Sequence, residues 1–512
     1  MPQDQATTIA FLSSPAAFGG SGPVKVVETH GAFIFLCGGT ALKLKRAVKY
    51  DYMDLSTRGK RHRMIARELE LNRPAAPQIY RDVLAVTRAD DGTLALGGSG
   101  EPVDWVLRMH RFPAENELTA VAARGELDDR LAASIGTALA GYHAAAKVHR
   151  QPGSPLMGAV IDELERVFSG FPKAEAARDA AEWLQEARAA LARVAPLLDK
   201  RGSEGHVRRA HGDLHLRNIV LMDGQPVAYD ALEFDETLGT CDLLYDLAFL
   251  LMDLCHRGLD RAACRVLDAW LTAFRGEEDG GLAGLPMFMS VRAAIRAMVL
   301  LQTDAARGKP EESAAEIGLY LAQARRFLAD SAPVLIAVGG FSGTGKSVLA
   351  RELAPGLGAA PGAVIVSSDA VRKAGLPART RLPGEAYEAS AREAVYRALF
   401  ARTRTILGAG HSVILDATFL DPAHRQAAEE IAKSLSIPFS GVWLEAPRGV
   451  LEQRISARKG DTSDADIAVL QSQLEHGAGP VTWTRFDASR DDWRAAVHGY
   501  VKSRDAGGVQ GA

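Results

Sequence analysis

The beginning of the chain alternates between apolar and polar positions, a pattern that is typical of β-strands. β-Branched and aromatic residues gather in two runs, 24–27 and 32–37, which predict two strands. A Gly-Gly-Thr turn and a third alternating run over 41–45 predict that the chain returns as a hairpin. Because successive side chains of a strand point to opposite faces, Lys43 and Lys45 are expected on one face of this third strand.

The hydrophobic period then lengthens to that of amphipathic helices. A helix is predicted over 61–72, and a strand over 106–109 leads into a long helical region. The last helix of this region, 311–330, is ended by Ser331-Ala332-Pro333. A small β-rich lobe followed by a helical lobe is therefore predicted. The other helices of the second lobe are expected over 131–146, 160–168 and 174–198.

Strands and helices alternate from residue 334 onward. This order predicts an α/β fold with a doubly wound parallel sheet, which binds ligands beyond the carboxyl ends of its strands. The strands are expected over 334–338, 363–367, 411–415 and 441–444, and helices over 347–353 and 385–407.

The chain of 512 residues is long enough for the two domains that these patterns predict, 1–330 and 331–512. No long linker separates them, so we expect them to pack against each other. The formal net charge is −3, which gives no general attraction to nucleic acid or to an anionic membrane. The acidic run 277–279 is expected to be a solvated loop.

The four cysteines form no C-x-x-C pair, so the sequence predicts neither a zinc site nor a disulfide framework. The N-terminus has no signal-peptide pattern, and no apolar run is expected to reach the length of a membrane span. These features predict a cytoplasmic protein.

The stretch GFSGTGKS, residues 340–347, has the form of a P-loop between a strand and a helix. Such a loop turns backbone N–H groups toward phosphate oxygens, and the N-terminus of the following helix adds positive potential. Lys346 is predicted to reach the β- and γ-phosphates of a nucleotide, and Ser347 to hold Mg²⁺. The phosphate cradle is predicted to consist of Gly340, Ser342, Gly343, Thr344 and Gly345.

Two aspartates end neighbouring strands of the same predicted sheet. Asp416 is expected to coordinate Mg²⁺ through water, as a Walker-B aspartate does, and Asp369 is the candidate general base for an acceptor hydroxyl. Arg454 and Arg458 share one helix face and are predicted to close over the transferring phosphate.

A second chemical centre is HGDLHLRN, residues 211–218. Asp213 and Asn218 have the spacing of the protein-kinase catalytic loop, in which the aspartate accepts the acceptor's proton and the asparagine holds a metal. A predicted hairpin follows and ends in Asp230, the position of a second metal ligand.

A lysine and a glutamate accompany this centre. Lys43 on its strand and Glu68 on the following helix have the order that positions ATP phosphates in protein-kinase-like folds. Lys45 is the alternative to Lys43, because both are expected on the same face.

Residues 1 to about 330 resemble the aminoglycoside phosphotransferase family, which has a bilobal protein-kinase-like fold. The resemblance is carried by HGDLHLRN, by the hairpin ending in YDALEF, and by CDLLYDLAFLLMDL. It implies that Asp213 is the catalytic base, that Asn218 and Asp230 are Mg²⁺ ligands, and that Asp246 braces the catalytic loop.

Residues 331 to about 490 resemble small P-loop kinases of the gluconate-kinase, zeta-toxin and polynucleotide-kinase types, which include predicted AAA-family ATP-binding proteins. GFSGTGKS, SSDAVRK, VILDATF and an R-x-x-x-R pair carry this resemblance. It implies that Asp369 and Arg372 face the acceptor.

These patterns together predict a bifunctional ATP-dependent phosphotransferase with two ATP·Mg²⁺ sites. Each site is expected to move a γ-phosphoryl group to a hydroxyl of a small metabolite. Two alternatives stay open: the P-loop domain is a polynucleotide 5′-hydroxyl kinase, or one domain is a non-catalytic ATP sensor. The acidic net charge favours a small molecule over nucleic acid.

Overall fold

The computed structural model describes residues 5–20, 22–50, 53–171, 176–309, 312–373, 389–457 and 466–507. Two compact units form, and several segments of the chain cross between them. The domain boundary at residue 330 stays a prediction. Unit 1 comprises Met1–Leu127, Tyr142–Gln151 and Glu204–Asp246, and unit 2 comprises Asp128–Gly141, Pro152–Ser203 and Leu247–Ala512.

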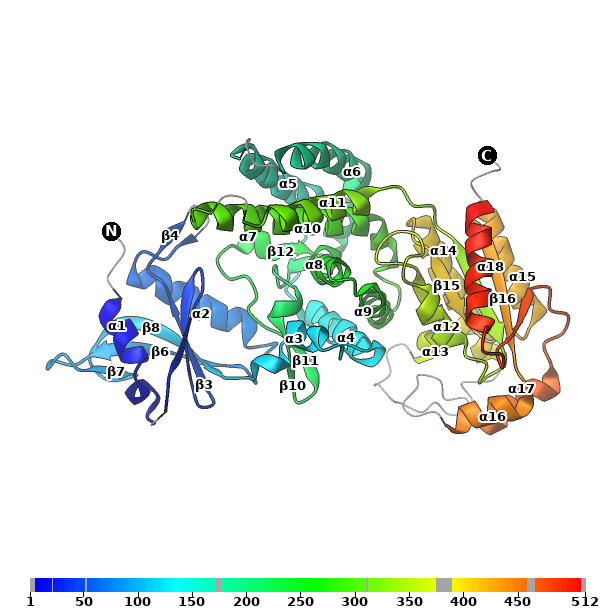
Figure 1. The fold of residues 1–512 in the computed structure, drawn as a ribbon, viewed down its shortest axis with the longest axis horizontal. Helices are drawn as coiled ribbons and strands as arrows, with labels where there is room; N and C mark the ends of the chain where they lie inside the picture. Colours follow the sequence, from blue (N-terminus) through cyan, green and yellow to red (C-terminus); the bar gives the residue numbers. More distant parts are fainter. Residues whose placement is uncertain are drawn as a thin grey trace. The chain divides into compact units, whose positions relative to one another are not determined.

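Unit 1 contains an antiparallel sheet in the order β1-β2-β3-β8-β6-β7 (Figure 1). Its apolar face buries Phe35, Leu42 and Leu44, and the two leucines alternate with lysines along β3 as the sequence predicts. The predicted strands are confirmed, whereas β6, which lies between β8 and β7, was not predicted. The strands are β1 (Lys25–Glu28), β2 (Ala32–Cys37), β3 (Thr40–Lys45), β6 (Tyr80–Arg88), β7 (Leu94–Leu96) and β8 (Glu101–His110).

The helix α2 (Arg58–Asn72) packs on β6 and β8 and presents one buried residue per turn. Arg61 pairs with the buried Asp104 at 2.8 Å, and Ile65 joins the apolar cluster beneath the helix. Glu68 follows on the same face and is fully buried. The spacing of three to four residues therefore carries Glu68 inward.

The segment 204–246 forms two small sheets in unit 1. β9 (Val207–Arg209) pairs with β12 (Thr240–Asp242), and the predicted hairpin is present as β10 (Ile219–Met222) and β11 (Gln225–Ala228). The other elements that begin in unit 1 are α1 (Ala6–Leu12), η1 (Pro15–Phe18), β4 (Lys49–Tyr50), β5 (Met53–Asp54), η2 (Ala114–Asn116), α3 (Leu118–Ala123), η3 (Leu216–Asn218), α7 (Glu236–Gly239) and α8 (Leu243–His256).

Unit 2 contains long helices followed by a parallel sheet. By length and composition, one helical stretch of the described chain, Asp279–Ala306, could cross a membrane, so the expectation of no such stretch was wrong. Its most apolar window is 67% buried, as in a core helix. The helices are α4 (Asp129–Ala145), α5 (Gly153–Ser169), α6 (Ala177–Glu204), α9 (Asp260–Ala273), η4 (Asp279–Gly284), α10 (Leu285–Ala306) and α11 (Ala314–Leu328).

The sheet of unit 2 has the order β14-β15-β13-β16-β17, and all its strands are parallel. The chain leaves the central β13 first toward β14 and later toward β16, so β13 marks the switch point at which ligands bind. Apolar side chains of α12 and α18 pack in one cluster with those of the strands, and Figure 1 shows both helices beside the sheet. The strands are β13 (Leu335–Gly340), β14 (Val364–Ser367), β15 (Val413–Asp416), β16 (Phe439–Glu445) and β17 (Thr484–Asp487). The helices are α12 (Lys346–Leu353), α13 (Ser368–Lys373), α14 (Ala389–Gly408), α15 (Pro422–Ser434), α16 (Arg448–Ser456), α17 (Ile467–His476) and α18 (Trp493–Gly507).

The edge strand β14 is anchored to α9 within unit 2. The carboxylate of Asp268 accepts the backbone N–H of Ile365 at 2.9 Å, and the Cys264 thiol donates to the Pro361 carbonyl at 3.3 Å. Burial raises the pKa of Asp268 to about 6, although the nearby Arg265 lowers it. The predicted packing of the C-terminal sheet against the preceding helices is thus present in this unit.

In the acidic run 277–279, which the sequence predicts to be a solvated loop, Glu277 is exposed but the other two residues are buried. Glu278 is 2% exposed and pairs with Arg201 of α6 at 2.7 Å. Asp279 is 1% exposed and receives two hydrogen bonds from Arg402 of α14, at 2.8 and 2.9 Å. The partners lie far away in the sequence, so a local pattern could not reveal them.

Candidate active sites

Two lysines and three carboxylates of unit 1 form a connected cluster, which we call the lysine site. The Lys43 Nζ atom lies 2.7 Å from Glu68 Oε1 and 2.8 Å from Asp230 Oδ1. The Lys45 Nζ atom lies 2.6 Å from Glu68 Oε2 and 2.5 Å from Glu233 Oε1. Glu68 therefore bridges both lysines. Only Lys43 has an ion pair with Asp230, the predicted metal ligand, so the geometry favours Lys43 over Lys45 as the phosphate lysine.

The cluster keeps its main groups charged. Burial lowers the pKa of Lys43, but Asp230, Glu68 and Glu233 together raise it well above its ordinary value. Burial likewise raises the pKa of Asp230, but Lys43 more than offsets this, and the net pKa is lowered. Lys43 is thus a cation and Asp230 an anion at neutral pH, as phosphate and metal binding require.

Asp230 is held in an uncommon backbone conformation, with a φ of 62°. Its backbone N–H donates to the Tyr80 hydroxyl at 2.9 Å, and the next N–H, of Ala231, donates to Asn72 Oδ1 at 2.8 Å. These contacts from β6 and α2 hold the turn that directs the Asp230 side chain. Neither Tyr80 nor Asn72 was predicted, because no local pattern links them to a residue about 150 positions away.

Asp213 and Asn218 lie together in the catalytic loop. Asn218 Nδ2 donates to the Asp213 carbonyl at 2.8 Å and to Asp213 Oδ2 at 2.9 Å. This arrangement directs the amide nitrogen toward Asp213 and leaves Asn218 Oδ1 as an oxygen ligand of the kind that Mg²⁺ prefers. Asp213 is 42% exposed, so an acceptor hydroxyl can reach its carboxylate.

Asp246 braces this loop, as the sequence predicts. Its side chain is fully buried and accepts the N–H groups of His211 and Gly212, at 3.0 and 2.8 Å. His143 Nε2 lies 3.0 Å from the same carboxylate. Three partners on one buried carboxylate fix the backbone of the two residues that directly precede Asp213.

The P-loop of unit 2 has the backbone that its glycines permit. Gly340, Gly343 and Gly345 have φ values of 140°, 89° and 96°. A Cβ atom on Gly340 would lie 2.3 Å from the Leu444 carbonyl oxygen, and one on Gly343 would lie 2.9 Å from the Leu451 carbonyl oxygen. The loop therefore needs glycine for both conformation and space.

One peptide group, between Phe341 and Ser342, is contacted on both sides. Its carbonyl accepts Lys346 Nζ at 2.9 Å and the Thr344 hydroxyl at 2.8 Å. Its N–H donates to Gln473 Oε1 of α17 at 2.9 Å. The sequence did not single out Gln473, which lies 131 residues from the loop.

Ser347 and Asp416 meet beside the P-loop. The Ser347 hydroxyl is hydrogen-bonded to Asp416, which is 5% exposed. Burial raises the pKa of Asp416, while Lys346 lowers it in part. A hydroxyl and a buried carboxylate next to a phosphate cradle form a donor set that fits Mg²⁺.

These groups line a cavity of about 720 Å³. Asp369 and Arg372 line its side near β14, and their side chains pair at 2.9 Å. Arg454 also lines the cavity, and its Nη2 donates to the Ala488 carbonyl at 2.8 Å. Arg458 lies outside the described residues. Lining residues that the sequence did not single out include Arg392, Tyr396, His424 and Gln473.

Comparisons with known proteins match two different regions of the chain. A model of the phosphotransferase enzyme family matches residues 60–284, and a model of an AAA domain matches residues 335–480. An uncharacterized protein of Mycobacterium tuberculosis is 30% identical over 499 residues, which cover 94% of this chain and 96% of that protein. The chain belongs to the same family. The resemblances inferred from the motifs are confirmed: this chain combines a phosphotransferase-family domain with an AAA domain that contains the P-loop.

Two solved structures are similar in part. A choline/ethanolamine kinase family protein from Mesorhizobium loti covers 63% of this chain and 94% of its own, with 16% identity and a TM-score of 0.42. A gluconokinase from Sinorhizobium meliloti covers 35% of this chain and 98% of its own, with 23% identity and a TM-score of 0.26.

The two family matches include most of the site residues. The phosphotransferase-family match includes Glu68, Asp213, Asn218 and Asp230, whereas Lys43 precedes it. The AAA-domain match includes the whole P-loop. Both matched domains are kinase-like, which supports phosphotransfer as the general activity of this two-domain family member.

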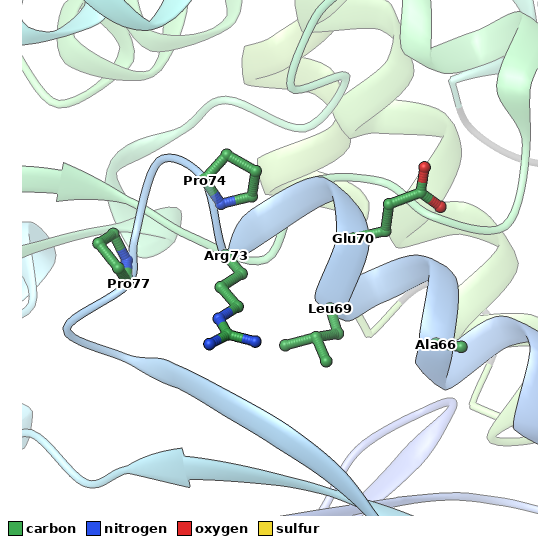
Figure 2. A pocket seen from close by; sticks show the side chains of 6 residues that line it. All are labelled: Ala66, Leu69, Glu70, Arg73, Pro74 and Pro77. Atoms are coloured by element: carbon green, nitrogen blue, oxygen red, sulfur yellow. The ribbon is translucent and has the colours of Figure 1, made fainter.

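A further pocket in unit 1 lies apart from the predicted chemistry. It is formed at the end of α2 and in the loop that follows, where Leu69 and Arg73 project from the same side of the helix (Figure 2). The lining residues are Ala66, Leu69, Glu70, Arg73, Pro74 and Pro77, and none of them belongs to the lysine site.

Proposed function

We propose that the chain is a bifunctional ATP-dependent phosphotransferase with one ATP·Mg²⁺ site in each unit. The observation that carries the proposal is that each unit brings together its own lysine, its own Mg²⁺-type oxygen ligands and its own candidate base. In unit 1 these groups are Lys43, Asn218, Asp230 and Asp213, and in unit 2 they are Lys346, Ser347, Asp416 and Asp369.

At the lysine site, the acceptor oxygen forms a bond to the γ-phosphorus of ATP as the bond to the bridging oxygen of ADP breaks. The hydroxyl proton passes to the Asp213 carboxylate, and ADP leaves with the electron pair of the broken bond. Lys43, held by Glu68, neutralises phosphate charge. Mg²⁺ held by Asn218 and Asp230 would supply further charge neutralisation.

At the P-loop, backbone N–H groups and Lys346 hold the phosphates, and Asp369 accepts the proton of the acceptor. Arg372 pairs with Asp369 at 2.9 Å and holds its carboxylate in position. Arg454 faces the cavity from α16 and contributes positive charge to the transferring group. Mg²⁺ held through Ser347 and Asp416 would orient the phosphates.

The acceptors in this proposal are small molecules with a hydroxyl group, and the setting is the cytoplasm, where ATP is abundant. The net charge of −3 disfavours a polyanionic acceptor such as nucleic acid.

The test is ATP consumption by the full chain against a panel of sugars, amino-alcohols, aminoglycosides, nucleosides and 5′-hydroxyl RNA. Asp213→Ala and Lys346→Ala variants run in parallel. We expect at least one acceptor whose phosphorylation is lost in one variant only. The acceptor of the other site should lose its phosphorylation only in the other variant.

Three results would contradict the proposal. Phosphorylation of RNA alone at the P-loop would identify a polynucleotide kinase. Activity that survives Asp213→Ala and falls only with Lys346→Ala would make unit 1 a non-catalytic module. Nucleotide binding without turnover of any acceptor would indicate ATP sensing.

A further inference from the structure

Gln473 makes a contact for which a packing role alone does not account. Its Oε1 atom accepts the N–H of Ser342 at 2.9 Å, inside the P-loop. Backbone N–H groups of such a loop ordinarily serve phosphate oxygens. A side chain from α17 thus reaches directly into the phosphate cradle.

The position of α17 fixes this reach. Leu470 and Leu474 pack in a small apolar cluster with Phe341 of the P-loop and with Leu451 and Ile455 of α16. Val469, Ser472 and Gln473 lie on the neighbouring face and line the 720 Å³ cavity. The helix is therefore packed against the loop through one face and open to the ligand cavity through the next.

Gln473 shares one peptide group of the cradle with Lys346. Lys346 Nζ contacts the carbonyl of the same peptide group whose N–H binds Gln473. Lys346 is the group proposed to reach the β- and γ-phosphates, and Lys346 and Gln473 line the same cavity. With Oε1 on Ser342, the Nε2 amide group of Gln473, a residue that lines the cavity, is left as a donor.

We propose that Gln473 is a catalytic residue that donates an Nε2–H hydrogen bond to the γ-phosphoryl group, while its Oε1 stays on the Ser342 N–H. This proposal rests on the proposed P-loop function. The carboxamide carries no charge, so it orients the γ-phosphoryl group without adding a charge to the site. Its two ends tie the position of that group to the backbone of the loop.

The experiment compares two nucleotides and two substitutions in the full chain. Lys43→Ala is introduced throughout, so that the lysine site does not contribute. Binding of Mg²⁺ with ADP, and with an imido analogue of ATP that keeps the γ-phosphate, is measured by titration calorimetry. Gln473→Glu retains the acceptor for Ser342 and removes the donor, whereas Gln473→Ala removes both. Gln471→Ala is the matched control, because Gln471 is an exposed residue of the same helix.

We expect Gln473→Glu to weaken binding of the ATP analogue at least about tenfold and binding of ADP no more than about twofold. The substitution replaces a hydrogen-bond donor to a charged phosphate oxygen by a carboxylate, and only the analogue has the γ-phosphate. Gln473→Ala should weaken the analogue less than Gln473→Glu does. Gln471→Ala should change neither affinity.

A structural role gives the opposite order. Gln473→Glu would then match the parent, because the Ser342 contact survives, and Gln473→Ala would weaken both nucleotides equally. Either result overturns the inference. A parent protein that binds neither nucleotide overturns the proposed P-loop function itself, a result that differs from both of these.

Discussion

In the proposed function both candidate sites hold a polyphosphate, but they are built from different chemical groups. The lysine site is made of side chains from three separate stretches of the chain, in which Lys43 is already bound by Glu68 and Asp230. The P-loop site is made of eight consecutive residues whose main phosphate ligands are backbone N–H groups. The lysine site presents its charge on a network of ion-paired side chains, whereas the P-loop presents the dipoles of its backbone N–H groups.

This difference has an energetic consequence. Each charge of the lysine site is needed by its neighbours, because a buried ion that loses its partner is costly. The P-loop keeps its shape through glycine conformations and helix packing, and its lysine contacts a neutral carbonyl group. We therefore expect stability and activity to be coupled in the lysine site and separable in the P-loop site.

The largest expected effect is on turnover. Lys43→Ala and Lys346→Ala should each reduce turnover at their own site by about 10²- to 10³-fold, because each removes a cation that stabilises transferring phosphate. Each variant should leave the reaction of the other site within a few-fold of wild type. Steady-state ATP consumption with the acceptor of each site measures both. Loss of both activities in either variant would show that the sites are not independent.

The second effect is on stability and tests the comparison most directly. Lys45→Met should destabilise the protein by about 3–5 kcal/mol, because it leaves Glu68 and Glu233 buried without this cation. Lys346→Met should cost no more than about 1.5 kcal/mol, the value of an ordinary hydrogen bond. Thermal and urea unfolding of the full chain give the two midpoints. Equal shifts would remove the distinction between an ion-pair site and a backbone site.

A third prediction concerns the backbone of the P-loop. Gly343→Ala should cost about 1–3 kcal/mol and weaken nucleotide binding, because its φ is 89° and the new Cβ would meet the Leu451 carbonyl oxygen at 2.9 Å. Gly356→Ala is the control, with a φ of 78° and open space around it, and should cost about 1 kcal/mol without affecting binding. Nucleotide titration and thermal midpoints of both variants decide the matter. A Gly343→Ala protein that binds ATP normally would contradict the proposed cradle.

The smallest expected effect is a pH dependence away from both sites. The pKa of Asp268 is raised from 3.8 to about 6 by burial, so the folded protein holds this proton more tightly than the unfolded chain. The contribution of Asp268 to stability therefore falls as the pH rises from about 4 to 6 and remains low above that range.

The matched variant is Asp268→Asn, which does not titrate and keeps an oxygen for Ile365. The difference in unfolding free energy between Asp268→Asn and wild type should increase by about 1.4 kcal/mol, in favour of the variant, from pH 5 to pH 7.5. This is the value of one pH unit, the interval between pH 5 and the folded pKa of Asp268. Thermal midpoints at the two pH values test this. A constant difference between variant and wild type would mean that the pKa of Asp268 is not raised to about 6 in the folded protein.

The same comparison explains what the sequence could predict. The P-loop and the Asp213–Asn218 interval are local, so spacing alone indicated their geometry, and the alternation of strands and helices indicated the parallel sheet. Lys43 and Lys45 could not be separated, because they share one strand face and the deciding partner, Asp230, lies 187 residues from Lys43.

Contacts between distant segments account for the rest. Glu278 and Asp279 form an acidic run of the kind that usually faces water, and only the folded chain brings Arg201 and Arg402 to them. Gln473 belongs to no recognisable phosphate motif, and its role depends on how α17 packs beside Phe341. β6 escaped prediction because polar residues interrupt its alternation, while its two neighbouring strands supply the pairing that fixes it.

The anchor between α9 and β14 bears on how this protein can be divided. A fragment that starts at residue 331 would lack Asp279, the ion-pair partner of Arg402. It would also lack Asp268, which accepts the backbone N–H of Ile365 at the outer edge of β14. An uncovered strand edge invites pairing with other chains, so such a fragment is prone to aggregate. The P-loop half is therefore a poor candidate for free exchange between genes. This anchor favours keeping both halves together on one chain. The relative from Mycobacterium tuberculosis matches 94% of the present chain.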